Sequence, residues 1–157
     1  MILPIVAYGA PILRAQCRDI EPDYPDLKWL IADMWETLDF IGGAGLAAPQ
    51  VNQDIRLFIV DSRSTFDEMS PEMRLSFPDN PGIRQVFINA RVTGYSGGAY
   101  SEEEGCLSFP GLWENIQRLE SVTLSWMDEQ FQPHVATFHG PTARMIQHEY
   151  DHIEGKL

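Results

Sequence analysis

QHEYDHIEGKL, residues 147–157, contains the pattern H-E-x-x-H at His148, Glu149 and His152. On a helix, residues four apart project from nearly the same face, so both imidazoles can bind one metal ion while the glutamate acts as a general base. The alternative is a solvated or hydrogen-bonded pair of histidines, but chance seldom produces this pattern in a chain of this size. The motif therefore favours a metal site.

Apolar residues around the motif recur at helical spacing: Ala143, Ile146, Tyr150 and Ile153. Proline suits the first turn of a helix, threonine can cap it, and glycine commonly follows its last residue. We therefore expect a helix that begins near Pro141 and Thr142 and ends near Gly155.

The remaining elements are predicted from apolar spacing and from runs of β-branched and aromatic residues. They are, in chain order, a helix at residues 26–41, strands at 55–61 and 84–89, a surface loop at 62–83, and strands at 121–128 and 134–138. Because helices and strands are segregated and do not alternate, the order predicts an α+β fold with antiparallel or mixed sheets. The length predicts one catalytic domain over residues 1–157.

The charge balance excludes two classes of partner. The chain has 11 lysine and arginine residues against 23 aspartate and glutamate residues, a net charge of −12, which opposes binding to phosphate backbones and anionic membranes. The first residues lack the basic region of a secretory signal, and no apolar run approaches the roughly 20 residues that span a membrane. We expect a cytoplasmic protein without nucleic acid or membrane partners.

A third metal ligand has to come from upstream. One class of zinc proteases extends the motif to a further histidine, which would fall after Leu157, the last residue. The upstream candidates are His134, His139, the acidic run Glu102–Glu104 and Cys106. Cys106 has the most suitable surroundings, because glycine precedes it and a turn-prone SFPG follows, which lets a thiolate approach a metal from a loop or bulge. The residues alone leave open whether Cys106 is a ligand or an inert, buried thiol.

GGAGLAAPQ, residues 42–50, is a third unusual stretch. Its small residues let the backbone pass close to a ligand, and the side-chain amide of Gln50 can donate a hydrogen bond to a developing oxyanion. A nucleotide-binding loop is a weaker interpretation, because the stretch lacks the lysine and the glycine spacing of such loops. The remaining alternative is a plain connection from helix to strand.

GAGLAAPQ (43–50), EGCLS (104–108) and QHEYDH (147–152), in this order, resemble the three signature motifs of the peptide deformylase family. That family removes the N-formyl group from new bacterial polypeptides. The opening residues Ile5–Arg14 also resemble the start of the family. The resemblance covers nearly the whole chain and implies an α+β fold with the H-E-x-x-H helix in the middle of the molecule.

The resemblance implies three metal ligands: Cys106, His148 and His152. They would hold one divalent ion, Fe²⁺ in the cell, with Zn²⁺ as a replacement. It also implies Glu149 as the general acid and base, and it implies two donors to the formyl oxygen, Gln50 and the backbone N–H of Leu107. Two other functions fit the metal motif by itself: a metallopeptidase that cuts internal bonds, and a structural Cys-His-His site with a fourth protein ligand.

The implied substrates are N-formylmethionyl peptides. The resemblance implies that the backbone at Gly43, Gly45 and Gly105 lines the site where such a peptide binds. An apolar pocket for the methionine side chain is expected to include Met145 and Trp113, with Phe109 beside them, although core packing is the alternative for each. Many members continue beyond the G-K-L that ends at Leu157, and in some this extension docks on the ribosome. We expect that extension to be absent or truncated here, so the segment by which those members bind the ribosome would be missing.

Overall fold

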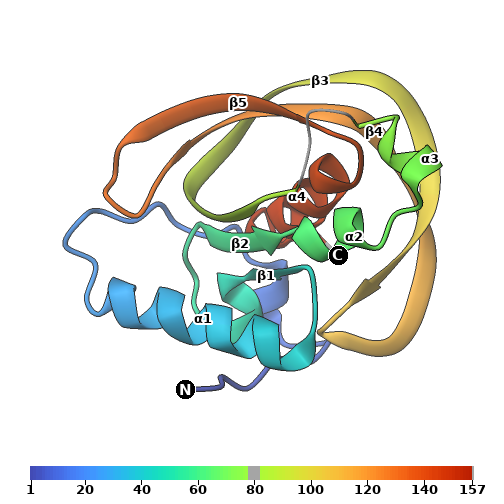
Figure 1. Ribbon diagram of the computed structural model, residues 1–157. Coiled ribbons are helices and arrows are strands. Elements are labelled where there is room, and N and C mark those ends of the chain that lie inside the picture. The colour runs from blue at the N-terminus through green and yellow to red at the C-terminus, as the bar shows by residue number, and fades with distance from the viewer. Residues whose placement is uncertain (78–81, 157) are drawn as a thin grey trace.

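The structure, a computed structural model, describes residues 1–77 and 82–156 (Figure 1). Its elements are α1 (Leu27–Ile41), β1 (Gly45–Ala47), β2 (Leu57–Asp61), α2 (Arg63–Asp67), α3 (Pro71–Arg74), β3 (Arg84–Cys106), β4 (Phe109–Met127), β5 (Pro133–His139) and α4 (Gly140–Ile153). Short 3-10 helices at Pro11–Arg14 and Ala48–Val51 precede α1 and follow β1. The predicted α+β fold is confirmed.

The five strands form one antiparallel sheet in the order β1-β2-β3-β4-β5. A tight turn joins β3 to β4, and several shifts of register along this pair bend it into a long curved hairpin. In Figure 1 the hairpin and β5 arch around α4, while β1 and β2 lie between α4 and α1. The H-E-x-x-H helix therefore lies in the middle of the molecule, as expected.

The hydrophobic core is divided into two clusters by β2. Leu57 and Ile59 pack into a cluster with the apolar face of α1, whereas Phe58 and Val60 pack into a second cluster with α4. Successive side chains of a strand point to opposite faces, so both faces of β2 are buried. This explains its continuous apolar sequence, because a strand covered on both faces needs no polar side.

The prediction of a short strand at residues 84–89 was wrong in its length. That segment is only the first part of β3, which continues to Cys106. Beyond residue 93 most side chains of β3 are exposed and many are polar, so this part lacks the apolar alternation by which a half-buried strand is recognised. Hydrogen bonding to β4 supports the strand there.

The helices differ from expectation in two places. The expected loop at 62–83 contains the short helices α2 and α3, and Phe66 of α2 is fully buried. Helix α4 begins after His139, without a side-chain cap. The Thr142 hydroxyl, which we expected to cap it, lies 2.8 Å from the Ser62 hydroxyl and ties α4 to the residue after β2. None of the described helices is long and apolar enough to span a membrane.

Candidate metal centre and active site

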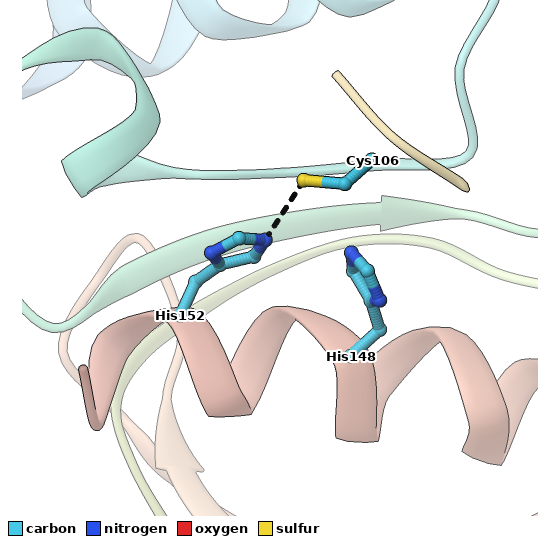
Figure 2. Close-up of side chains that lie close together, drawn as sticks. All are labelled: Cys106, His148 and His152. Carbon is cyan, nitrogen blue, oxygen red and sulfur yellow. Dashed lines mark hydrogen bonds between the residues drawn. The ribbon is translucent and has the colours of Figure 1, made fainter. Parts of the chain in front are cut away.

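Three side chains that can bind a metal converge between α4 and the end of β3 (Figure 2). The rings of His148 and His152 lie 5.0 Å apart, one turn from each other on α4, and the Cys106 sulfur lies 3.3 Å from Nε2 of His152. The candidate ligand atoms of all three lie within 4.8 Å of one another. Donors bound to one zinc or iron ion are roughly 3.3–3.8 Å apart, because each lies ~2.0–2.3 Å from the ion. The group therefore fits one divalent ion after small side-chain adjustments.

Cys106 reaches this position because β3 ends in an irregular turn. The register of β3 against β4 shifts between Gly105 and Cys106, and Cys106 then pairs with Phe109. A bulge of this kind redirects a side chain. Gly105 allows the close packing there, since a Cβ atom at this position would lie 2.9 Å from the ring of Trp113.

The two histidines differ in their electrostatic environment. Burial lowers the pKa of His152 to about 3, so its imidazole is neutral, as a metal ligand must be. Burial also lowers the pKa of His148, but the neighbouring Cys106 and Glu104 outweigh burial and raise it to about 10. His148 is therefore protonated when no metal is bound and is held by an anionic partner; a metal that binds one ring nitrogen would displace the proton there and leave the other N–H in place.

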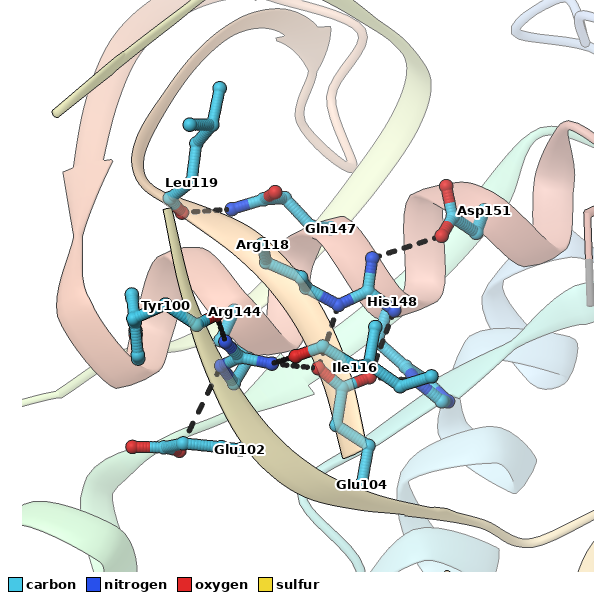
Figure 3. A network of polar contacts seen from close by, with 10 residues as sticks. All are labelled: Tyr100, Glu102, Glu104, Ile116, Arg118, Leu119, Arg144, Gln147, His148 and Asp151. Carbon is cyan, nitrogen blue, oxygen red and sulfur yellow. Dashed lines mark hydrogen bonds and ion pairs between the residues drawn. The ribbon is translucent and has the colours of Figure 1, made fainter. Parts of the chain in front are cut away.

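That partner is Glu104, whose side chain is 9% exposed and whose carboxylate orients His148 (Figure 3). Its Oε1 accepts a hydrogen bond from Nδ1 of His148 at 2.9 Å, and its two oxygens accept from Arg118 at 2.7 and 2.8 Å. Burial raises the pKa of Glu104, but His148 and Arg118 outweigh it and lower the pKa to about 2, so the carboxylate is ionised. With Nδ1 engaged, Nε2 of His148 is the nitrogen available to a metal.

Glu149, between the histidines in sequence, is buried against β1. Its side chain is 4% exposed, and its Oε1 has no hydrogen-bond partner among the described residues. A Cβ atom at Gly45 would lie 2.7 Å from Oε2 of Glu149, so only glycine leaves room for the carboxyl group. Burial raises the pKa of Glu149 to about 7, which suits a group that accepts and returns a proton near neutral pH.

Gln50 is held with its amide N–H groups toward Cys106. The side chain is 1% exposed; its Oε1 accepts from the backbone N–H of Ala47 at 3.0 Å, which leaves Nε2 to face the Cys106 sulfur at 3.4 Å and the Ser108 hydroxyl at 3.3 Å. The amide orientation is thus fixed by the backbone. Nε2 of Gln50 therefore lies beside the thiol of Cys106, one of the three candidate metal ligands.

The glycines of GAGLAAPQ (43–50) bring this motif into contact with the other two, EGCLS (104–108) and QHEYDH (147–152). A Cβ atom at Gly43 would lie 3.2 Å from the Leu38 side chain and 3.5 Å from that of Leu107. Leu107, directly after Cys106, packs against the first core cluster. The structure therefore brings Gly43 together with Leu107, and Gly45 together with Glu149.

A cavity of about 420 Å³ opens onto Cys106, His148 and His152. Its apolar lining is Tyr8, Phe109, Leu112 and Ile116. Two of the residues predicted for a methionine pocket lie elsewhere: Met145 packs against the second core cluster, and Trp113 is 65% exposed with its ring over Gly105. Of the predicted pocket residues, Phe109 lines this cavity.

Two residues near the site escaped the sequence analysis, and one was assigned a different role. Arg144 and Asp151 both belong to the ionic network around Glu104 and Arg118, and Glu104 itself was considered only as a candidate metal ligand. A pattern was available: Glu104 and Cys106 are two apart on a strand, and Arg144 and His148 are four apart on a helix, so each pair shares a face.

Comparison with known proteins bears on the whole chain. Residues 2–157 match the family model for polypeptide deformylase. The chain is 43% identical to a peptide deformylase of Christiangramia forsetii and 46% identical to one of Flavobacterium psychrophilum, and in each case the match covers all of this chain and 80% of the relative.

Solved structures give the same result. A class I type b peptide deformylase from Acinetobacter baumannii superimposes with a TM-score of 0.85 at 29% identity, covering all of this chain and 96% of the other. A peptide deformylase from Thermotoga maritima superimposes with a TM-score of 0.83 at 29% identity, covering all of this chain and 95% of the other. Sequence and structure therefore agree that the chain belongs to the polypeptide deformylase family, single-metal hydrolases that remove the N-formyl group from nascent polypeptides.

Proposed function

We propose that the chain, acting as one catalytic unit in the cytoplasm, deformylates N-formylmethionyl peptides with Cys106, His148 and His152 as ligands of a single Fe²⁺ ion. The observation that carries this proposal is the convergence of these three residues beside the fixed amide of Gln50. One thiolate and two imidazoles suit Fe²⁺ and also Zn²⁺, its expected replacement. When bound, the ion would act as a Lewis acid on the formyl oxygen and lower the pKa of a water molecule.

Glu149 is proposed to carry the proton. Its Oε1, which has no hydrogen-bond partner among residues 1–77 and 82–156, accepts a proton from the attacking water as the water oxygen bonds to the formyl carbon. The same carboxylic acid then gives that proton to the amine nitrogen as the carbon–nitrogen bond breaks. Formate and a free N-terminal amine result. A pKa of about 7 allows Glu149 to perform both transfers at neutral pH.

Gln50 and the backbone N–H of Leu107 are proposed to donate to the oxyanion that forms on the formyl oxygen. Donors that are already oriented need no reorganisation when charge develops, and Gln50 is held in this way by the backbone of Ala47. Leu107 follows Cys106 directly, so its backbone N–H belongs to the turn that comes straight after the thiol-bearing residue.

The peptide is proposed to run along the backbone at Gly43, Gly45 and Gly105, where the absence of side chains permits close approach. For the methionine side chain we propose Phe109, which lines the cavity at Cys106. Met145 and Trp113 do not line that cavity, and their contact with the substrate stays a sequence prediction. Testing these three separately would show which of them touches the substrate.

The deciding experiment measures formate release from a formyl-Met peptide by protein purified anaerobically and loaded with Fe²⁺. Glu149→Gln should lower kcat roughly 100- to 10,000-fold, the usual contribution of a general acid and base, with metal content unchanged. Glu154→Gln is the matched control: Glu154 directly follows the last residue of α4, pairs with Arg56 and should retain activity when substituted.

Two outcomes would contradict the proposal. One is absence of formate release by folded, metal-loaded wild-type protein. The other is cleavage of internal bonds in unformylated peptides, with metal content unaffected by Cys106→Ala, which would favour a metallopeptidase with a different ligand set.

A further inference from the structure

Arg144 is a buried cation in α4 that the proposed reaction does not use. It precedes His148 by one turn, and only 6% of it is exposed. An arginine is rarely buried to this extent without partners. Its guanidinium lies 4.5 Å from the centroid of the Tyr100 ring, a cation–π contact from the face of β3.

The two terminal nitrogens of Arg144 hold three different acceptors (Figure 3). Nη1 donates to Oε2 of Glu104 and, at 3.0 Å, to the carbonyl of Ile116 in β4. Nη2 donates at 2.7 Å to the carbonyl of Tyr100 in β3. Tyr100 and Ile116 lie two residue pairs apart along β3–β4, since Tyr100 pairs with Arg118 and Glu102 pairs with Ile116. Arg144 therefore fastens both strands of the hairpin to α4.

The contact with Glu104 extends this attachment to the metal centre. Arg118 donates to both oxygens of Glu104, and Arg144 adds a second donor at Oε2. Oε1 is thereby turned toward Nδ1 of His148. A continuous chain of hydrogen bonds runs from the backbone of Tyr100 and Ile116 through Arg144 and Glu104 to the His148 ring.

We infer that Arg144 is a positioning residue for the metal centre: by holding Glu104 against the hairpin, it fixes the orientation of the His148 imidazole toward the ion. This inference rests on the proposed role of His148 as a ligand. Arg144 itself does not touch the reacting atoms. Lysine cannot reproduce the arrangement, because a single ammonium nitrogen would replace a planar fork that serves three acceptors on the two strands β3 and β4.

Arg56 provides a matched control within the same chain. It is 3% exposed, donates to the carbonyl of Ala90 at 2.7 Å and to Glu154 at 3.1 Å, and lies 5.6 Å from the Tyr150 ring centroid. Arg56 and Arg144 are therefore comparable in their burial and in their partners, which for each are a backbone carbonyl, a carboxylate and an aromatic ring. The partners of Arg56 among the described residues include neither Glu104 nor His148, so its loss should affect stability without affecting the metal centre.

The experiment compares Arg144→Met, Arg144→Lys and Arg56→Met by two measurements that do not depend on turnover. The first is metal affinity by competition with a chelator; the second is the visible absorption spectrum of the Co²⁺ form, which reports ligand geometry. Arg144→Met should lose roughly 10- to 100-fold in affinity, the usual effect of removing an outer partner of a ligand, and should shift the Co²⁺ bands. Arg144→Lys should shift the bands as well, and it keeps the test available if the methionine variant does not fold.

Arg56→Met should lower the midpoint of thermal unfolding while keeping wild-type affinity and spectrum. Wild-type affinity and spectrum in folded Arg144→Met or Arg144→Lys would overturn the inference, and so would an equal loss of affinity in Arg56→Met. Combining Arg144→Met with Glu104→Gln tests the route: if Arg144 acts through Glu104, the double variant should lose less than the product of the two single losses.

Failure of the proposed ligand set would be visible separately. If His148→Ala retained wild-type metal affinity, His148 would not be a ligand, and the role of Arg144 would fall with it. If His148→Ala lost the metal and Arg144→Met did not, the ligand assignment would stand and only the inference about Arg144 would be overturned.

Discussion

The two halves of the β3–β4 hairpin are built on different physical principles. The basal half, residues 84–92 and 122–127, contributes buried apolar side chains to the core clusters, among them Phe87 and Leu124. The distal half, residues 94–106 and 109–121, is mostly exposed and is fastened to α4 by the Glu104, Arg118 and Arg144 network. The half that is held by polar contacts is the one that carries Cys106. Stability and chemistry are thus largely assigned to different ends of one pair of strands.

The strongest test of this division is Phe87→Ala in the basal half. Phe87 is fully buried, with its ring 4.9 Å from Phe58 and 5.0 Å from Trp126, so its removal leaves a cavity and should cost about 3–5 kcal/mol of unfolding free energy. Denaturant unfolding followed by circular dichroism measures this. The control is Tyr95→Ala, an aromatic residue of the distal half that is exposed; a loss there equal to that of Phe87→Ala would remove the distinction.

The two cysteines give a chemical test of the same division. Cys17 packs with the second core cluster, and burial is the main cause that raises its pKa to about 12. At pH 8 its thiolate should be roughly 2,000-fold scarcer than that of an ordinary thiol with a pKa of about 8.5. Iodoacetamide labelling followed by peptide mass spectrometry should therefore modify the half-buried Cys106 first, and added Zn²⁺ should protect it. Equal labelling of the two cysteines in folded protein would argue against the difference in burial.

A smaller effect is expected from Gln147→Leu. The Gln147 amide donates at 2.9 Å to the carbonyl of Leu119, a link from α4 to the distal half. Leaving that carbonyl without its partner should cost about 1–3 kcal/mol. Because the distal half is held by few such links, hydrogen exchange should become faster in residues 109–121 and stay unchanged in residues 84–92. Uniform acceleration in both segments would mean that the hairpin opens as one unit.

The same contrast explains how far sequence reasoning reached. The helix with His148 and His152 and the helix α1 follow from apolar periodicity, and the basal strand at 84–89 follows from its run of β-branched and aromatic residues. Each has a counterpart in the structure. The distal half was not predicted as strand. Most of its side chains face solvent and its strands are held by backbone hydrogen bonds, so its sequence shows no apolar periodicity. Glu104 was recognised as part of an acidic run but not as the partner of His148, because that contact depends on how β3 lies across α4.

Recognition of the three motifs provided what periodicity could not. GAGLAAPQ and EGCLS identify residues 43–50 and 104–108 as parts of one site, although they are more than 50 residues apart in the chain. Arg144 remained outside those motifs. Its role depends on contacts with two backbone carbonyls and one carboxylate. Contacts with backbone carbonyls cannot be predicted from a pattern of residue types.

The burial of β2 on both faces implies an order of events in folding. The first cluster consists of residues between Ile20 and Ile88, so it can collapse without the C-terminal part of the chain. The second cluster needs Ala143, Ile146 and Ile153 of α4, whose contacts with β2 span more than 80 residues of sequence, and contacts of such long range form slowly. Pulse-labelled hydrogen exchange should show α1 protected before α4; simultaneous protection would refute this order. Assembly of the catalytic centre would then be the last step by which the chain becomes an enzyme.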